Sequence, residues 1–216
     1  MDSPRAYIAA HPECLLLYGV TDSAWLEGRS LAACVSDAVA GGTTFVQLRE
    51  KKMATDALVS FAREVHAACP DVPFVIDDDV DAAARSGADG VHVGQEDAAC
   101  ASARARLGDD AIVGVSVQTV AQALRAERDG ADYLGVGAIF KTATKAEAAD
   151  VSLETLRAIC DAVDIPVVAI GGLNERTVDV LAGTGVRGAA VVSALFSADD
   201  VRGAAQRLSE RLHHVL

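Results

Sequence analysis

The octapeptides GADGVHVG (residues 87–94) and GADYLGVG (residues 130–137) repeat one pattern: a helix end, a tight turn and a buried strand. On either side of them, short runs of Val, Ile and other apolar residues alternate with Ala-rich helical stretches. The expected strands are residues 15–20, 44–48, 73–76, 90–94, 112–117, 133–137, 166–170 and 189–194. The expected helical stretches include 30–41, 55–69, 98–108, 119–130, 152–163 and 175–183.

Eight strands alternating with helices in 216 residues predict an α/β protein of the (β/α)8, or TIM, barrel class, with residues 1–216 as one domain. The apolar fraction of 51% is enough for a large core. An open doubly wound sheet is the alternative, but the first strand is not followed by GxGxxG, and eight regular units are many for that fold.

The charge distribution predicts an anion site. The formal net charge is -12, yet the four lysines occupy only two short segments, at Lys51 and Lys52 and at Lys141 and Lys145. Clustered cations in an acidic molecule indicate a local positive pocket for a phosphate or diphosphate. The alternative is a chance arrangement in a composition that prefers arginine.

Other compositional features exclude several classes. The acidic balance argues against binding to nucleic acid or to an anionic membrane surface. No apolar run reaches transmembrane length, and the first residues lack the order of a signal peptide. The five cysteines are far apart and form no CxxC pair, which favours a cytoplasmic protein with reduced thiols and no cysteine metal site.

Polar residues follow the expected strands, and the carboxyl ends of barrel strands form the active site in this fold. Gln47, Arg49 and Lys51 alternate along an extended segment, so their side chains point to one side. A guanidinium and an ammonium group placed together suit a diphosphate. An exposed strand edge is the alternative interpretation of this segment.

Paired acids follow two adjacent strands and predict a metal site. Asp78 and Asp97 are carboxylates beside expected phosphates, and Mg²⁺ resolves their repulsion because it prefers hard oxygen ligands. The acidic run also suits a helix N-terminus. We expect both roles, with Asp79 and Asp81 at the helix start and Asp78 on the metal.

Further polar groups converge on the same rim. Gly171 and Gly172 end the seventh strand and Ser193 follows the eighth, where backbone N–H groups form the common phosphate site of this fold. The other strand-end candidates are Ser116, Gln118, Thr142, Thr144 and Lys145. His92 lies inside an expected strand, and such a histidine is more often a core residue, so we expect only a secondary role at the barrel mouth.

The motifs QLREK, GVHVGQED, GVSVQT, GADYLGVGAIFKTATK, VVAIGG and VVSA together resemble the thiamine phosphate synthase family. The resemblance runs from about Leu15 to Ala198 with the motifs in family order. It implies a (β/α)8 barrel transferase that joins hydroxymethylpyrimidine diphosphate to hydroxyethylthiazole phosphate with Mg²⁺, giving thiamine phosphate and diphosphate. It implies a cytoplasmic enzyme, and a homodimer is compatible with it.

The resemblance also implies residue roles. It places the diphosphate on Arg49, Lys51 and Lys145, with Ser116 beside it, and the pyrimidine on Gln47. It assigns Mg²⁺ to Asp78 and Asp97. The thiazole phosphate is expected on Thr142, Thr144, Gly171, Gly172, Val192 and Ser193.

Three features depart from the family pattern. Asp77 stands where relatives usually have an Asn that touches the diphosphate. Ala138, Lys141 and Ala143 replace prolines of the lid segment, and Gln118 stands where many relatives have His. None of these changes removes a residue that the expected reaction requires.

The implied chemistry is dissociative: diphosphate leaves, a pyrimidine-stabilised cation forms, and the thiazole nitrogen captures it. The candidate residues contain no convincing nucleophile–base pair, which agrees with this chemistry. Two alternatives remain at this point, a thiazole tautomerase of the same fold and a non-catalytic phosphate-binding regulatory barrel. Retention of the diphosphate and metal residues, and the absence of His at Gln118, favour the synthase.

Overall fold

The computed structural model describes residues 3–95, 100–141 and 151–216, and its strands close into a barrel. All neighbouring strands are parallel, and β8 pairs with β1 to complete the ring. The strands are β1 Leu17–Val20, β2 Phe45–Leu48, β3 Phe74–Asp77, β4 Gly90–Val93, β5 Ile112–Val117, β6 Tyr133–Val136, β7 Val167–Ile170 and β8 Gly188–Val191. Each corresponds to an expected strand, which confirms the predicted (β/α)8 class.

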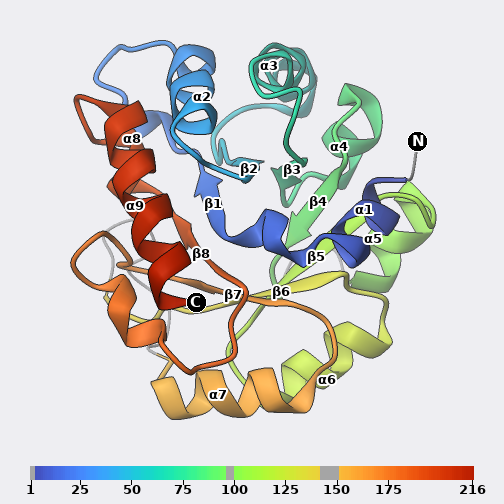
Figure 1. The fold of residues 1–216 in the computed structure, drawn as a ribbon. Helices are drawn as coiled ribbons and strands as arrows, with labels where there is room; N and C mark the ends of the chain where they lie inside the picture. The colour runs from blue at the N-terminus through green and yellow to red at the C-terminus, as the bar shows by residue number, and fades with distance from the viewer. Residues whose placement is uncertain (1–2, 96–99, 142–150) are drawn as a thin grey trace.

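Helices surround the barrel (Figure 1). They are α1 Pro4–Ala10, α2 Leu31–Ala40, α3 Thr55–Ala67, α4 Val80–Ser86, α5 Cys100–Leu107, α6 Val120–Arg128, α7 Leu153–Ala162, α8 Ser193–Phe196 and α9 Val201–Val215, with 3₁₀ turns η1 Pro12–Leu15, η2 Ser23–Trp25 and η3 Val178–Leu181. Most begin at a side chain that accepts a backbone hydrogen bond, such as Ser30 before α2 and Thr119 before α6. No helix in these described residues is long and apolar enough to cross a membrane.

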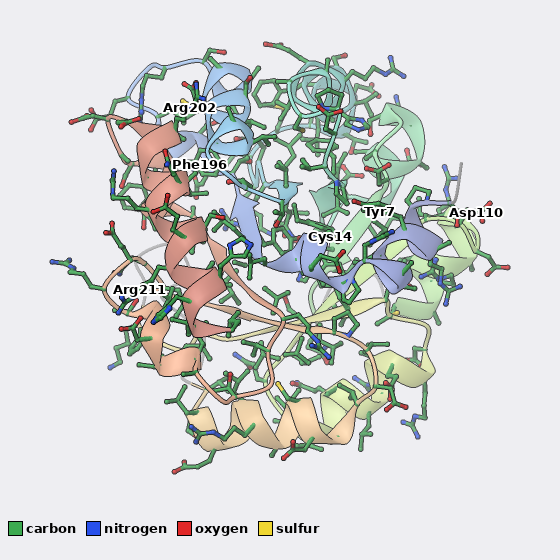
Figure 2. All side chains as sticks on the ribbon, viewed as in Figure 1. Tyr7, Cys14, Asp110, Phe196, Arg202 and Arg211 are labelled. Atoms are coloured by element: carbon green, nitrogen blue, oxygen red, sulfur yellow. The ribbon has the colours of Figure 1, made fainter. Side chains whose placement is uncertain are left out.

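One expected helix is wrong. Residues 175–183 form only the 3₁₀ turn η3. Thr177, Val178 and Val180 are β-branched and lower helix propensity. Gly183 follows with a φ of 66°, which ends the turn. The short connection is covered by α9, whose Arg211 pairs with Asp179 of η3 (Figure 2).

The core has two layers. The larger layer lies between the strands and the helices and is built mainly from Val, Leu, Ile and Ala. The smaller layer fills the barrel itself, where Tyr18, Phe45 and Tyr133 pack with ring centroids 4.5 to 5.9 Å apart. The barrel interior is therefore a packed core with aromatic residues on its floor.

Helix α1 covers the end of the barrel at which the strands begin, and it lies across this end beside β5 (Figure 1). Asp132, immediately before β6, anchors the helix because its side chain lies 2.8 Å from Arg5 of α1 and 2.5 Å from Arg104 of α5. Its Oδ2 also accepts the N–H of Val113 at 2.7 Å. Ile8 of α1 is buried against the barrel interior. This end is closed, which leaves the opposite mouth for ligands.

Candidate active site

A cavity of about 740 Å³ opens where the strands end. It gathers these expected site residues from across the barrel: Gln47, Arg49, Lys51, Asp77, Asp78, Ser116, Gly171, Gly172, Val192 and Ser193. The predicted convergence on one rim is confirmed for these residues, whereas their individual roles remain predictions. Asp97, Thr142, Thr144 and Lys145 lie outside the described residues.

Cations and carboxylates are interleaved at one side of the cavity. Lys51 Nζ lies 2.9 Å from Asp77 Oδ2 and also contacts Asp78. Arg49 lies 2.9 Å from Asp22, which follows β1, and its Nε is 3.7 Å from Asp77. Because Arg49 and Lys51 follow β2 with their side chains on the same side, this geometry supports the predicted cation fork and excludes a strand edge facing only solvent.

The buried carboxylate of Asp77 is the unusual member of this cluster. Its side chain is 11% exposed, and burial, with the charge of Asp78 adding to it, raises its pKa although Lys51 and Arg49 oppose the shift. Its Oδ2 has no aligned hydrogen-bond donor in the described part of the chain, so the 2.9 Å contact with Lys51 is an ion pair with poor hydrogen-bond geometry.

The pKa of Lys51 is raised as well, which in a lysine favours the charged form. Burial lowers the pKa of its ammonium group, but contacts with Asp78 and Asp77 outweigh burial and the pKa is raised. The Lys51 side chain is half exposed, at 50%, so the ammonium remains accessible to an incoming anion. The cluster therefore keeps a permanently charged cation at the mouth of the cavity.

Asp78 has a backbone conformation that is rare for a residue with a side chain. Its φ is 61°, and its N–H donates to the His92 carbonyl at 2.9 Å. Asp79 then caps α4, since its side chain accepts the N–H of Ala82 at 2.8 Å. The expected division is confirmed for the helix start. Asp78 does not cap the helix and instead lines the cavity. A left-handed backbone conformation such as that of Asp78 often marks a functional position.

The described residues contain no group of three or more His, Cys, Asp or Glu side chains placed to hold a metal ion. Asp77 and Asp78 supply hard oxygen donors at the cavity, and Asp77 Oδ2 has no aligned hydrogen-bond donor among the residues described. This donor set suits Mg²⁺, which binds through few carboxylates together with phosphate oxygens and water.

Gly171 and Gly172 follow β7 in backbone conformations with φ of 106° and 64°. A Cβ at Gly171 would lie 2.6 Å from the Cβ of Ala138, and one at Gly172 would lie 2.6 Å from the Cβ of Phe140. Only glycine fits both the conformation and the close approach of the loop after β6. Thr177 Oγ1 donates to the Gly172 carbonyl at 3.1 Å and holds this turn in place.

Backbone N–H groups line this side of the cavity. Those of Gly171, Gly172, Val192 and Ser193 have no acceptor among the residues that the structure describes. The exposed Arg176 also lines the cavity, and its guanidinium has no ion partner in the same ranges. N–H donors and an arginine that line the same cavity can together bind an anion, on the opposite side from Lys51. Arg176 follows the end of β7 by six residues and was not among the residues expected at the site.

A buried polar chain crosses the floor of the cavity. Gln47 Nε2 donates to the Tyr18 hydroxyl, and the Tyr18 and Tyr133 oxygens are 2.7 Å apart. His92 Nδ1 lies 2.9 Å from the Tyr133 oxygen, and its Nε2 lies 2.9 Å from Ser116 Oγ. His92 is thus a hydrogen-bonded residue of the floor, and the two tyrosines were not expected at the site. The only sequence signal was that aromatic residues are scarce, at 4%, and that two of the three tyrosines lie within expected strands.

Comparison with known proteins identifies the chain. The family model described as thiamine monophosphate synthase matches residues 17–195. The chain belongs to this family. The thiamine-phosphate synthase of Clostridium tetani is 45% identical over 89% of this chain and 93% of the relative. That of Chloroflexus aurantiacus is 47% identical over 89% and 90%.

A solved structure agrees with this assignment. The thiamine phosphate pyrophosphorylase of Pyrococcus furiosus matches with a TM-score of 0.87 and 38% identity, over 94% of this chain and 98% of that one. The predicted family, barrel class and transferase class of the chain are therefore confirmed.

Proposed function

We propose that this member of the thiamine monophosphate synthase family condenses hydroxymethylpyrimidine diphosphate with hydroxyethylthiazole phosphate, releasing diphosphate and thiamine phosphate. The observation that carries the proposal is one cavity with two anion-binding sides. Arg49 and Lys51 lie on one side, and Arg176 lies on the other with backbone N–H groups that have no acceptor in the described part of the chain. Two phosphorylated substrates that must react with each other require such a cavity.

The diphosphate belongs on the side of Arg49 and Lys51. Their charges stabilise the negative charge that develops on the leaving group as the bond between the pyrimidine methylene carbon and oxygen breaks. Lys145 and Ser116 complete this contact set in our proposal. Asp77 and Asp78 fall within this region, so a diphosphate without a cation would meet repulsion from both.

Asp78 with Asp97 would hold Mg²⁺, which, when bound, neutralises the charge of the leaving diphosphate. Lys51 now pairs with both Asp77 and Asp78, and it is free to move to phosphate oxygens once those carboxylates face a divalent cation.

The thiazole phosphate belongs on the side of Gly171 and Gly172, with Val192, Ser193, Thr142 and Thr144 as the further proposed contacts. Anchored there, the thiazole directs its ring nitrogen at the methylene carbon of a pyrimidine that contacts Gln47. Diphosphate departs first, and the carbon–nitrogen bond forms when the thiazole nitrogen captures the pyrimidine-stabilised cation. Positioning of the two rings replaces a side-chain nucleophile.

A thiazole tautomerase would use the thiazole phosphate side alone. The interleaved cluster of Arg49, Lys51, Asp77 and Asp78 has no purpose in that reaction, nor in a regulatory barrel that binds one phosphate. We further propose that the whole chain acts as one barrel domain in the cytoplasm on these small molecules, as a monomer or homodimer, without nucleic acid or membrane.

The test is an assay of the purified chain with both substrates and Mg²⁺, in which the thiamine phosphate formed is oxidised chemically to fluorescent thiochrome phosphate. We expect product only when both substrates and Mg²⁺ are present, with one diphosphate released for each product. Absence of product, together with isomerisation of a thiazole carboxylate phosphate, would assign the tautomerase instead.

A further inference from the structure

The polar chain on the cavity floor joins side chains from five strands. Gln47 lies on β2, Tyr18 on β1, Tyr133 on β6, His92 on β4 and Ser116 on β5. Its two ends line the cavity, and Gln47, Tyr18, Tyr133 and His92 are buried. A continuous buried chain of this kind has a direction, because each hydroxyl and each neutral imidazole donates one hydrogen.

The direction is set at Gln47. Its Nε2 can only donate, so the Tyr18 oxygen accepts. Within the described residues, the Tyr18 hydrogen has no acceptor except the Tyr133 oxygen at 2.7 Å. Tyr18 therefore donates to Tyr133, and the Tyr133 hydrogen goes to His92 Nδ1.

The last bond follows from the tautomer. With Nδ1 accepting, neutral His92 carries its proton on Nε2 and donates to Ser116 Oγ at 2.9 Å. The Ser116 oxygen is used as an acceptor, and its own hydrogen has no acceptor among the described residues. Ser116 is half-buried at the cavity, so this hydrogen is available to a ligand there.

The barrel is built to accommodate this chain. A Cβ at Gly114 would lie 2.2 Å from the Tyr133 ring and 2.5 Å from His92 Nδ1, and one at Gly135 would lie 3.1 Å from the His92 ring. Because both strand positions are glycine, the Tyr133 and His92 side chains have space to form their hydrogen bond. Burial raises the pKa of both Tyr18 and Tyr133, so their hydroxyls remain protonated donors.

We propose that this chain is a polarised relay in which the orientation of the Gln47 amide fixes the proton of His92 on Nε2 and thereby makes Ser116 a hydrogen-bond donor toward the cavity. Turning the amide by 180° would present its oxygen to Tyr18 and reverse every bond. Ser116 would then donate to His92 and turn only lone pairs to the ligand. Tyr18, Tyr133 and His92 act as positioning residues.

The consequence for catalysis rests on the proposed function. Because Gln47 gives its nitrogen to Tyr18, its amide oxygen remains for a substrate that carries an N–H group, such as an aminopyrimidine. Such a substrate holds the amide in the orientation that makes Ser116 a donor. Ser116 then meets the leaving diphosphate with a hydrogen instead of a lone pair. Recognition of the ring is thus coupled to stabilisation of the leaving group.

The direct test is the tautomer of His92, read from two-bond ¹H–¹⁵N correlations of the full chain labelled with ¹⁵N-histidine at pH 8. His92→Gln, which lacks the ring, assigns its signals among the five histidines. We expect a proton on Nε2 and none on Nδ1. A proton on Nδ1 in the wild-type chain would overturn the proposal, and this result does not depend on whether the chain makes thiamine phosphate.

A second arm tests the coupling. In Gln47→Glu the ionised carboxylate can only accept, so the His92 proton should move to Nδ1 once the ¹³C shift of the carboxyl reports ionisation. Adding Tyr133→Phe breaks the chain, and His92 should then no longer respond to the residue at position 47. An unchanged tautomer beside an ionised Glu in the single variant would contradict the relay.

A kinetic experiment distinguishes a role of the Tyr133 hydroxyl in turnover from a role of its ring in packing. Tyr133→Phe keeps the ring but removes the hydroxyl, and we expect kcat to fall about tenfold with both KM values little changed. Tyr7→Phe, at an exposed tyrosine of α1, is the matched control and should leave kcat unchanged. Full kcat in Tyr133→Phe would overturn the proposed role of the relay in turnover.

Discussion

Lys51 Nζ lies 2.9 Å from Asp77 Oδ2, so a cation expected to hold diphosphate is paired with the residue that departs from the family pattern. The pair explains how this chain accommodates an acid at that position. It compensates part of the negative charge at the cavity before substrate arrives. Under the proposed function the pair should also make the site more dependent on Mg²⁺, since Lys51 must leave Asp77 to meet a phosphate oxygen.

The first prediction concerns the metal requirement. Asp77→Asn should retain activity and lower the Mg²⁺ concentration for half-maximal rate by about fivefold, corresponding to about 1 kcal/mol of relieved repulsion. Initial rates across a Mg²⁺ titration measure it. Asp71→Asn, at an exposed acid, is the control. Loss of activity in Asp77→Asn would instead make the acid a required ligand.

The same substitution makes a prediction about stability and pH. Burial raises the pKa of Asp77 above its ordinary value of 3.8, so the native state binds this proton more tightly than the unfolded state. Ionised Asp77 therefore costs stability above its raised pKa, and the cost disappears as the pH falls toward 3.8. Asp77→Asn should increase the free energy of unfolding at pH 7, with a smaller gain at pH 4.5. Urea titrations at both pH values measure the gain in the free energy of unfolding. A larger gain at pH 4.5 than at pH 7 would contradict this prediction.

The third prediction concerns the closed end of the barrel. Asp132→Asn should reduce the free energy of unfolding by about 3–5 kcal/mol, because Arg5 and Arg104 would lose their shared, largely buried carboxylate. The substitution lies away from the cavity, so kcat of the folded protein should stay near wild type. Denaturant unfolding measures the loss, with exposed Asp129→Asn as control. Equal stability of the two variants would refute the anchoring role.

The fourth prediction concerns the glycine turn after β7. Gly172→Ala should raise KM for the thiazole phosphate at least tenfold, because its Cβ would meet Phe140 at 2.6 Å and displace the N–H groups. Gly183→Ala is a matched control: its φ of 66° is nearly the same, but no atom lies within 4 Å of its Cβ. Steady-state kinetics measure KM for the thiazole phosphate in both variants. A similar KM in the two would show that this turn does not bind phosphate.

The fold was largely predictable because apolar runs and helical stretches alternate along the sequence, and eight such units predict a closed barrel. Each apolar run between helical stretches became a strand, and Gln47, Arg49 and Lys51 came together because they end one strand with alternating side chains. The expected helix at 175–183 failed because β-branched residues and Gly183 oppose it.

The rest of the site depends on contacts between distant strands. Tyr18 and Tyr133 are 115 positions apart, and their hydroxyls meet only because the barrel closes around them. The pairing of Arg49 with Asp22 likewise depends on β1 and β2 being adjacent. No local motif marks either contact, so residue types and spacing alone could not predict them.

The central claim, two separate anion sites in one cavity, is tested most directly by calorimetry on two variants. Lys51→Ala should weaken binding of inorganic diphosphate with Mg²⁺ by about 10–30-fold and leave thiazole phosphate affinity unchanged. Arg176→Ala should do the reverse, because Arg176 lines the glycine side of the cavity. Loss of affinity for the same ligand in both variants, or the opposite pattern, would contradict the account.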